Sequence, residues 1–284
     1  EFEPVKNKDN MSSRTLITLT TIPSRIPRIP MTLKSLCLQT EPVDKIRVYI
    51  PNQYERFTKS CEMTYRPILD NILNLDPRIE IIDVIDDLGP LSKIAFAAID
   101  PSVKNDFDRV IFVDDDHIYA PTFVSAFGNN QKYCLTQTGT SLDRFTPYQT
   151  KAALKYGPQP RFKGLTYRLN RIMRRGATKP SPWTTGGFVD LVEGWGGVCV
   201  NPSWFDDEFL EIPHDIRRAD DVWISGYLES RGIGILVRPD CSLPKDNGNS
   251  EIDSLKGEQT FGQDPIAVYS RAVDICRQRW GIWE

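Results

Sequence analysis

Short apolar runs alternate with amphipathic stretches along the first 120 residues. Thr15–Thr20 is a run of apolar and β-branched residues that stops before Pro23, which predicts a strand and then a loop. Residues 32–39 have helical spacing, and residues 45–50 alternate as a strand does. The pattern continues with helices expected at 65–75 and 91–99 and strands expected at 81–85 and 109–113. Such a pattern predicts a mostly parallel sheet covered by helices, with ligands at the carboxyl ends of the strands.

After Tyr119 the apolar runs are shorter and are separated by Gly and Pro. Strands are expected at Val198–Val200 and 233–237, and helices at Asp220–Ser230 and 266–280. The sequence contains no internal repeat and no clear linker. We therefore expect residues 14–284 to form one domain with two halves, 14–120 and 121–284, after a polar lead-in at 1–13 that begins like a cloning remnant or tag.

Composition and charge narrow the class of protein. The 284 residues are 40% hydrophobic, and no apolar run approaches the ~20 residues needed to cross a bilayer. The six cysteines lack the CxxC spacing of a zinc site. Residues 144–189 contain ten cations and no Asp or Glu, whereas the rest of the chain has 25 basic against 38 acidic residues. An acidic body binds nucleic acid poorly, so we expect no nucleic-acid partner and interpret the basic segment as a flap over an anionic ligand or a solvated loop.

The sharpest chemical signal is VIFVDDDHIY, in which Asp114, Asp115 and Asp116 directly follow an apolar strand. Three adjacent carboxylates repel one another unless a cation or hydrogen-bond donors neutralise them. Oxygen ligands of this kind suit Mg²⁺ or Mn²⁺ bound to a diphosphate. A solvated acidic turn after the strand is the alternative interpretation.

Three other features are candidates for the same site. Asp220 and Asp221 open a predicted helix, where they either cap it or face a cleft. The glycines of residues 193–197 would let a ligand approach the backbone, and Trp195 would stack on a sugar, although a simple turn with a core tryptophan is the alternative. Lys93 lies in the first turn of a predicted helix, where it is either a phosphate ligand or a solvated charge.

Five motifs together resemble GT-A glycosyltransferases related to capsule and viral glycan enzymes. TLTTIPSRI, DLGPLSK, FVDDDHIY, GWGGV and ADDVWIS occur in that family's order. The resemblance implies a Rossmann-like, three-layer α/β/α sandwich in which residues 14–120 bind the nucleotide and residues 121–284 the acceptor. The family's late metal-binding histidine is missing, because no histidine follows Asp221. Another oxygen ligand such as Asp246, or the diphosphate and water, would have to replace it.

The resemblance also implies a reaction and a role for each candidate residue. With Mn²⁺ or Mg²⁺, the enzyme would move a sugar from a UDP- or GDP-sugar to a hydroxyl of a glycan, glycoprotein or lipid-linked acceptor, with inversion. The metal would be held by Asp116 and Asp114, the nucleotide by Thr21, Pro23, Arg25, Lys93, Asp114 and Asp115, and the sugar or acceptor by Glu193, Trp195, Gly196, Gly197 and Trp223, with Asp221 as catalytic base beside Asp220.

Other interpretations stay open at this level. One is a retaining enzyme of the same fold. A dehalogenase-type phosphatase also places DxDx(T/V) after an apolar strand, but Ile118 occupies the last position and a full α/β unit precedes the motif. A non-enzymatic carbohydrate-binding protein would use Trp183, Trp195 and Trp223 without needing Asp221. A trimmed, membrane-anchored enzyme of the Golgi lumen and a cytoplasmic enzyme would have the same sequence features.

Overall fold

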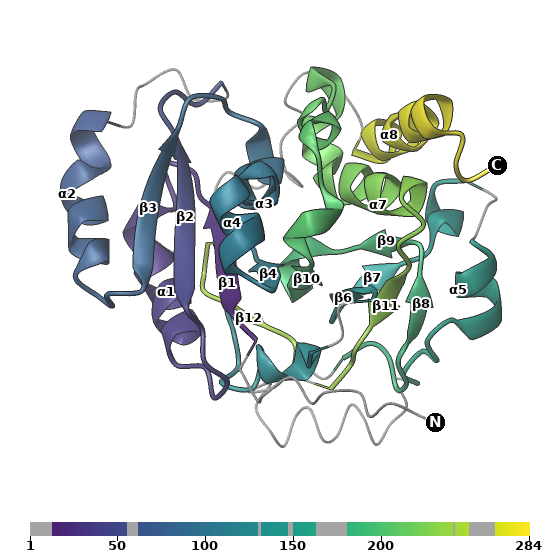
Figure 1. The fold of residues 1–284 in the computed structure, drawn as a ribbon, viewed down its shortest axis with the longest axis horizontal. Helices are drawn as coiled ribbons and strands as arrows, with labels where there is room; N and C mark the ends of the chain where they lie inside the picture. The colour runs from purple at the N-terminus through teal and green to yellow at the C-terminus, as the bar shows by residue number, and fades with distance from the viewer. Residues whose placement is uncertain are drawn as a thin grey trace, which may run out of the picture.

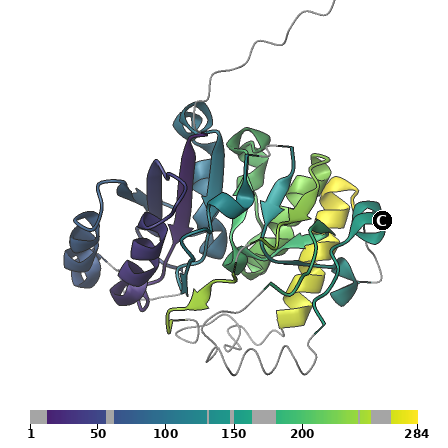
Figure 2. The same cartoon turned by 90° about the horizontal axis from the view of Figure 1, so that it is seen from below.

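The computed structural model describes residues 13–55, 62–129, 132–146, 150–162, 181–240, 242–249 and 265–284, without the side chains of 62–66 and 265. Figure 1 shows one large sheet with helices packed on it, and Figure 2 shows the same arrangement from below. The first half of the chain builds one end of this sheet and the second half builds the other.

Four parallel strands form the first part of the sheet, in the order β3 (Ile79–Val84), β2 (Lys45–Pro51), β1 (Thr15–Thr20) and β4 (Arg109–Phe112). Their strong apolar and β-branched content explains why the sequence pattern located all four. The expected 81–85 strand begins two residues earlier and ends one residue earlier than predicted.

The sheet continues beyond β4 with β10 (Val198–Val200), β6 (Cys134–Thr136), β11 (Ile235–Val237) and β8 (Gly187–Val189). β10 is antiparallel to both β4 and β6, β11 is parallel to β6, and β8 is antiparallel to β11. The predicted α/β class with a large, mostly parallel central sheet is therefore confirmed.

The side chains of each central strand alternate between two hydrophobic clusters, one on each face of the sheet. Leu16 and Val110 belong to the cluster that contains α3 (Ser92–Ile99), α4 (Pro101–Asp106), α7 (Asp220–Ser230) and α8 (Pro265–Trp280). Their neighbours Ile17 and Ile111 belong to the cluster that contains α1 (Ile29–Cys37) and α2 (Glu62–Leu73). The helices thus cover both faces, as a three-layer α/β/α arrangement requires.

Helix α1 begins at Ile29, three residues before the expected position, and ends at Cys37. The helix includes Pro30 in its first turn, where proline is tolerated because its missing N–H has no partner there in any case. By contrast, α7 occupies the expected residues Asp220–Ser230.

Shorter elements connect the sheet to the candidate site. β5 (His117–Ile118) pairs antiparallel with β12 (Lys245–Asp246), and β7 (Gly139–Thr140) with β9 (Leu191–Val192). The short helix α5 (Lys151–Tyr156) packs beside β8. Short 3₁₀ segments occur at Ile26–Arg28, Gly89–Leu91, Ser125–Phe127, Leu142–Arg144, Gly194–Gly196, Pro202–Trp204, Asp207–Leu210 and His214–Ala219. Within the described ranges, no helix has the length and apolar character needed to cross a membrane.

Candidate functional site

The aspartate triplet follows the carboxyl end of β4, next to the end of β1. The Asp114 side chain is 32% exposed, whereas those of Asp115 and Asp116 are 7% and 13% exposed. The three carboxylates therefore have different environments even though they are adjacent in sequence, and Asp114 is the most accessible of them.

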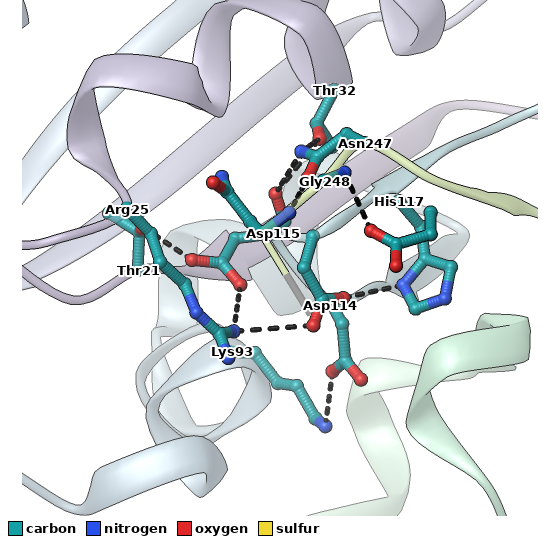
Figure 3. Close-up of polar contacts among 12 residues, drawn as sticks. Thr21, Arg25, Thr32, Lys93, Asp114, Asp115, His117, Asn247 and Gly248 are labelled. Carbon is teal, nitrogen blue, oxygen red and sulfur yellow. Dashed lines mark hydrogen bonds and ion pairs between the residues drawn. The ribbon is translucent and has the colours of Figure 1, made fainter. Parts of the chain in front are cut away.

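Both the carboxylate and the backbone carbonyl of Asp115 accept hydrogen bonds from other parts of the chain (Figure 3). Its carboxylate accepts hydrogen bonds from the Thr21 hydroxyl at 2.5 Å and from the Arg25 guanidinium at 2.9 Å. Its backbone carbonyl accepts from the Thr32 hydroxyl and the Asn247 amide. Burial raises the pKa of Asp115 to about 6, although the charge of Arg25 acts in the opposite direction. Asp115 thus fixes the loop after β1 against the triplet, and its carboxylate is less accessible than that of Asp114.

Asp116 is shared between two cationic or protonatable groups. Arg25 lies 3.3 Å from one of its oxygens, and Nδ1 of His117 contacts the other. Burial would raise the pKa of Asp116, but the hydrogen bond and charge of His117, together with Arg25, lower it overall. The expected nucleotide ligand Arg25 is thus engaged with two carboxylates. Pro23 is buried in the turn that brings Arg25 back toward the triplet, because the Arg25 N–H donates to the carbonyl of Ile22.

Lys93 lies inside the protein rather than on its surface. Its side chain is 5% exposed, and Nζ lies 2.8 Å from Asp114 and 3.0 Å from Asp220 (Figure 3 shows the first contact). Burial alone would lower the pKa of Lys93, but the charges of Asp114, Asp220 and Asp221 raise it well above its ordinary value. The ammonium therefore joins the triplet to the acidic pair, two features that lie far apart in the sequence.

The acidic pair at the start of α7 faces the triplet, and both of its side chains contact residues outside the helix. The N-cap residue is Ala219, which has no capping side chain. Asp220 is 5% exposed and pairs with Lys93, whereas Asp221 is more exposed and accepts a hydrogen bond from the Gly194 N–H at 3.1 Å. Burial and the neighbouring charge of Asp220 raise the pKa of Asp221 well above its usual range. Asp221 is only partly buried, so it is the more accessible member of the pair.

The glycine loop, residues 193–197, is packed against side chains of other parts of the protein. A Cβ added to Gly194 would lie 2.4 Å from Nζ of Lys93, and one added to Gly196 would lie 2.0 Å from Oγ1 of Thr138. Gly197 has φ +80°, and its Cβ would lie 2.4 Å from the Phe123 ring. Thr138 and Phe123 thus fill the space that a side chain at Gly196 or Gly197 would need, and contact of a donor sugar with this backbone stays a prediction.

The two residues of this loop that are not glycine lie at the edge of the site. Trp195 is partly exposed, and its ring centroid lies 5.8 Å from that of His117, beside the triplet. The Glu193 side chain is 27% exposed and lies 3.9 Å from Arg144. Both positions are compatible with contact to a sugar or an acceptor.

Trp223 is buried in the core, which corrects the expectation that it contacts a sugar or an acceptor. Its side chain is fully buried, and its indole N–H donates to the Phe209 carbonyl at 2.9 Å. The helical spacing of α7 explains the error, because residue 223 is turned into the core between α7 and α8, where it packs on Trp280.

The segment around Asn247 is part of the site although the sequence did not single it out. β12 places Asp246 opposite His117, and the Asn247 N–H donates to the Asp116 carbonyl at 2.9 Å. The Asn247 amide also donates to Thr32. The only sequence signal was the polar, glycine-containing run 246–249, which is typical of any turn. Asp246, considered only as a substitute oxygen ligand, is thus next to the triplet.

The described residues provide few protein ligands for a cation. Within them, no group of three or more His, Cys, Asp or Glu side chains is arranged to hold a metal ion. The carboxylates of Asp114 and Asp116 are nevertheless oxygen donors of the type that Mn²⁺ and Mg²⁺ prefer. Of the basic segment 144–189 that we interpreted as a flap, residues 147–149 and 163–180 lie outside the described residues.

Comparisons with known proteins give limited similarity. No family model matches the chain, and no curated protein matches its sequence. A mannosyltransferase from Pyrobaculum calidifontis, solved with GDP-Man and Mn²⁺, is 14% identical, with 81% of this chain and 56% of that chain covered and a TM-score of 0.45. TarS of S. aureus, solved with UDP-GlcNAc, is 12% identical, with 81% and 57% covered and a TM-score of 0.46. This chain spans less than two thirds of the length of either of these two proteins.

Proposed function

We propose that the protein is a metal-dependent glycosyltransferase that moves a sugar from a nucleoside diphosphate donor, UDP- or GDP-linked, to an acceptor hydroxyl. The observation that carries the proposal is the meeting of two acidic motifs around one ammonium. Asp114 follows the central strand β4 and Asp220 opens α7, yet both contact Nζ of Lys93. A site that binds a cation and diphosphate next to a proton acceptor needs two such groups of carboxylates.

Asp116 and Asp114 are the proposed metal ligands, with Asp246 a candidate for a further one because β12 places it beside the triplet. A bound Mn²⁺ or Mg²⁺ would offset the negative charge that builds on the departing diphosphate. Asp114 would also accept from the ribose hydroxyls. Thr21 and Arg25 would orient the nucleotide end through Asp115, to which both already donate.

Asp221 is the proposed general base of an inverting reaction. It would take the proton from the acceptor hydroxyl while that oxygen bonds to the anomeric carbon and the bond between that carbon and the diphosphate oxygen breaks, with its electron pair leaving on the diphosphate. The raised pKa of Asp221, caused by burial and by Asp220, makes its ionised form a stronger proton acceptor. Trp195 and Glu193 are the proposed contacts of the sugar or acceptor, which would be a glycan, glycoprotein or lipid-linked molecule.

The test is calorimetric titration with UDP and with GDP, each with Mn²⁺ and after chelation. We expect binding that requires the cation and that Asp116→Ala weakens by at least tenfold. Asp76→Ala provides a matched control, because it removes an aspartate that is bound to Arg78 away from the triplet. Equal affinity after chelation, together with wild-type affinity in Asp116→Ala, would show that the metal assignment is wrong.

A further inference from the structure

Lys93 stands at the junction of three segments that carry the proposed chemistry. It belongs to the first turn of α3, and its ammonium contacts Asp114 after β4 and Asp220 at the start of α7. The third segment is the glycine loop, because a Cβ at Gly194 would lie 2.4 Å from Nζ and 3.1 Å from Cε of Lys93. The Gly194 N–H also donates to Asp221.

The environment of Lys93 does not suit a ligand for a diphosphate. Its side chain is 5% exposed, and two carboxylates already lie within 3.0 Å of its nitrogen. A buried ammonium is stable only when it is paired, and a carboxylate as buried as Asp220 equally needs a cation. To reach a phosphate, Lys93 would have to leave Asp220 unpaired inside the protein.

We propose that Lys93 is a positioning residue, which holds the metal-side carboxylate Asp114 and the α7 residue Asp220 at a fixed separation and thereby places the adjacent Asp221 for proton transfer. This inference rests on the proposed function. It also gives a reason for glycine at position 194: a side chain there would displace the Lys93 ammonium from its paired position. Misplacing a reacting group by about 1 Å costs on the order of 10²-fold in rate, so loss of the ion pairs of Lys93 should lower turnover strongly.

The experiment measures release of nucleoside diphosphate from whichever of UDP-glucose, UDP-GlcNAc and GDP-mannose the wild-type protein hydrolyses fastest with Mn²⁺. We compare Lys93→Met with Gly194→Ala, which crowds the ammonium from another segment without removing its charge. Both variants should lower kcat by about 10²-fold while the Kd for UDP or GDP with Mn²⁺ changes less than threefold. Gly194→Ala keeps the inference testable if Lys93→Met fails to fold.

Arg109→Met is the matched control. Arg109 is also a buried cation, and it is paired with Glu41 at the opposite end of β4 from Asp114. The Arg109→Met substitution should lower thermal stability and leave kcat per folded molecule unchanged. This control therefore separates an effect on positioning from a general loss of stability.

Two results would overturn the inference. An unchanged kcat in both Lys93→Met and Gly194→Ala would show that the ion pairs only support the fold. A Kd for UDP or GDP at least tenfold weaker in Lys93→Met, with kcat retained, would make Lys93 a phosphate ligand instead. In both cases the wild type is active and the proposed function stands, whereas a wild type that binds no nucleotide and releases none removes both proposals.

Discussion

Substituting Gly197 by alanine should destabilise the protein through two separable contributions. Gly197 has φ +80° and ψ 141°, a region that is almost restricted to glycine, and forcing another residue into it costs about 1–3 kcal/mol. The new Cβ would also lie 2.4 Å and 2.6 Å from two carbons of the Phe123 ring. Phe123 is 1% exposed and packs edge-on against Phe127, so its ring has no free space to move into. Overpacking of this kind costs about 1–3 kcal/mol more.

Gly232→Ala isolates the backbone contribution. Gly232 has φ +69°, but nothing lies within 4 Å of the position that its Cβ would take. Alanine at Gly232 should therefore cost only the roughly 1–2 kcal/mol of a left-handed conformation. We expect Gly197→Ala to lose about 1–3 kcal/mol more than Gly232→Ala, because only Gly197 also meets a buried ring.

The assay is guanidinium unfolding of both variants and the wild type, with the m-values compared to confirm that the same transition is measured. Binding of UDP or GDP with Mn²⁺ is then measured on the folded variants. Equal stability of the two variants, combined with weaker nucleotide binding in Gly197→Ala alone, would refute the packing argument. The glycine would then be required for approach of the donor, as the sequence had suggested.

Three other perturbations test separate parts of the structure. Asp221→Asn should lower donor turnover by about 10²- to 10⁴-fold with nucleotide affinity retained, whereas near wild-type rates in both Asp221→Asn and Asp220→Asn would favour a retaining mechanism or Glu193 as the base. Trp223→Phe should cost about 2 kcal/mol, measured by urea unfolding, because a cavity forms and the Phe209 carbonyl loses its donor; weaker nucleotide binding at full stability would return Trp223 to the site. Hydrogen bonds from Arg78 lower the pKa of Asp76 to about 2, so its stabilisation is complete above the ordinary pKa and is lost as pH falls from about 4 to 2. At pH 7 we expect Asp76→Asn to have a free energy of unfolding roughly 1 kcal/mol below that of the wild type, after a discount for solvent screening. This difference should shrink as the pH falls through that range. A difference that does not depend on pH would contradict the assignment.

The sequence by itself determined the position of those strands and helices that have a regular pattern of apolar residues. β1, β10 and α7 have the expected bounds, and the triplet lies at a strand end as predicted. The reason is physical: a strand between two helical layers must be apolar on both faces, and that requirement is visible in a few consecutive residues. The α/β class follows from the same local information.

Only the tertiary structure decided which partner each polar side chain meets. Lys93 had two equal interpretations in the sequence, and neither included an ion pair with Asp220, a residue more than a hundred positions away. Asn247 gave no signal beyond that of a turn, yet it binds the backbone of the triplet. Gly197 was correctly recognised as a special position, but its neighbour is Phe123 rather than an open cleft. Local sequence determines the type and extent of the regular elements, whereas the contacts of a side chain depend on how distant elements pack, which short-range patterns do not encode.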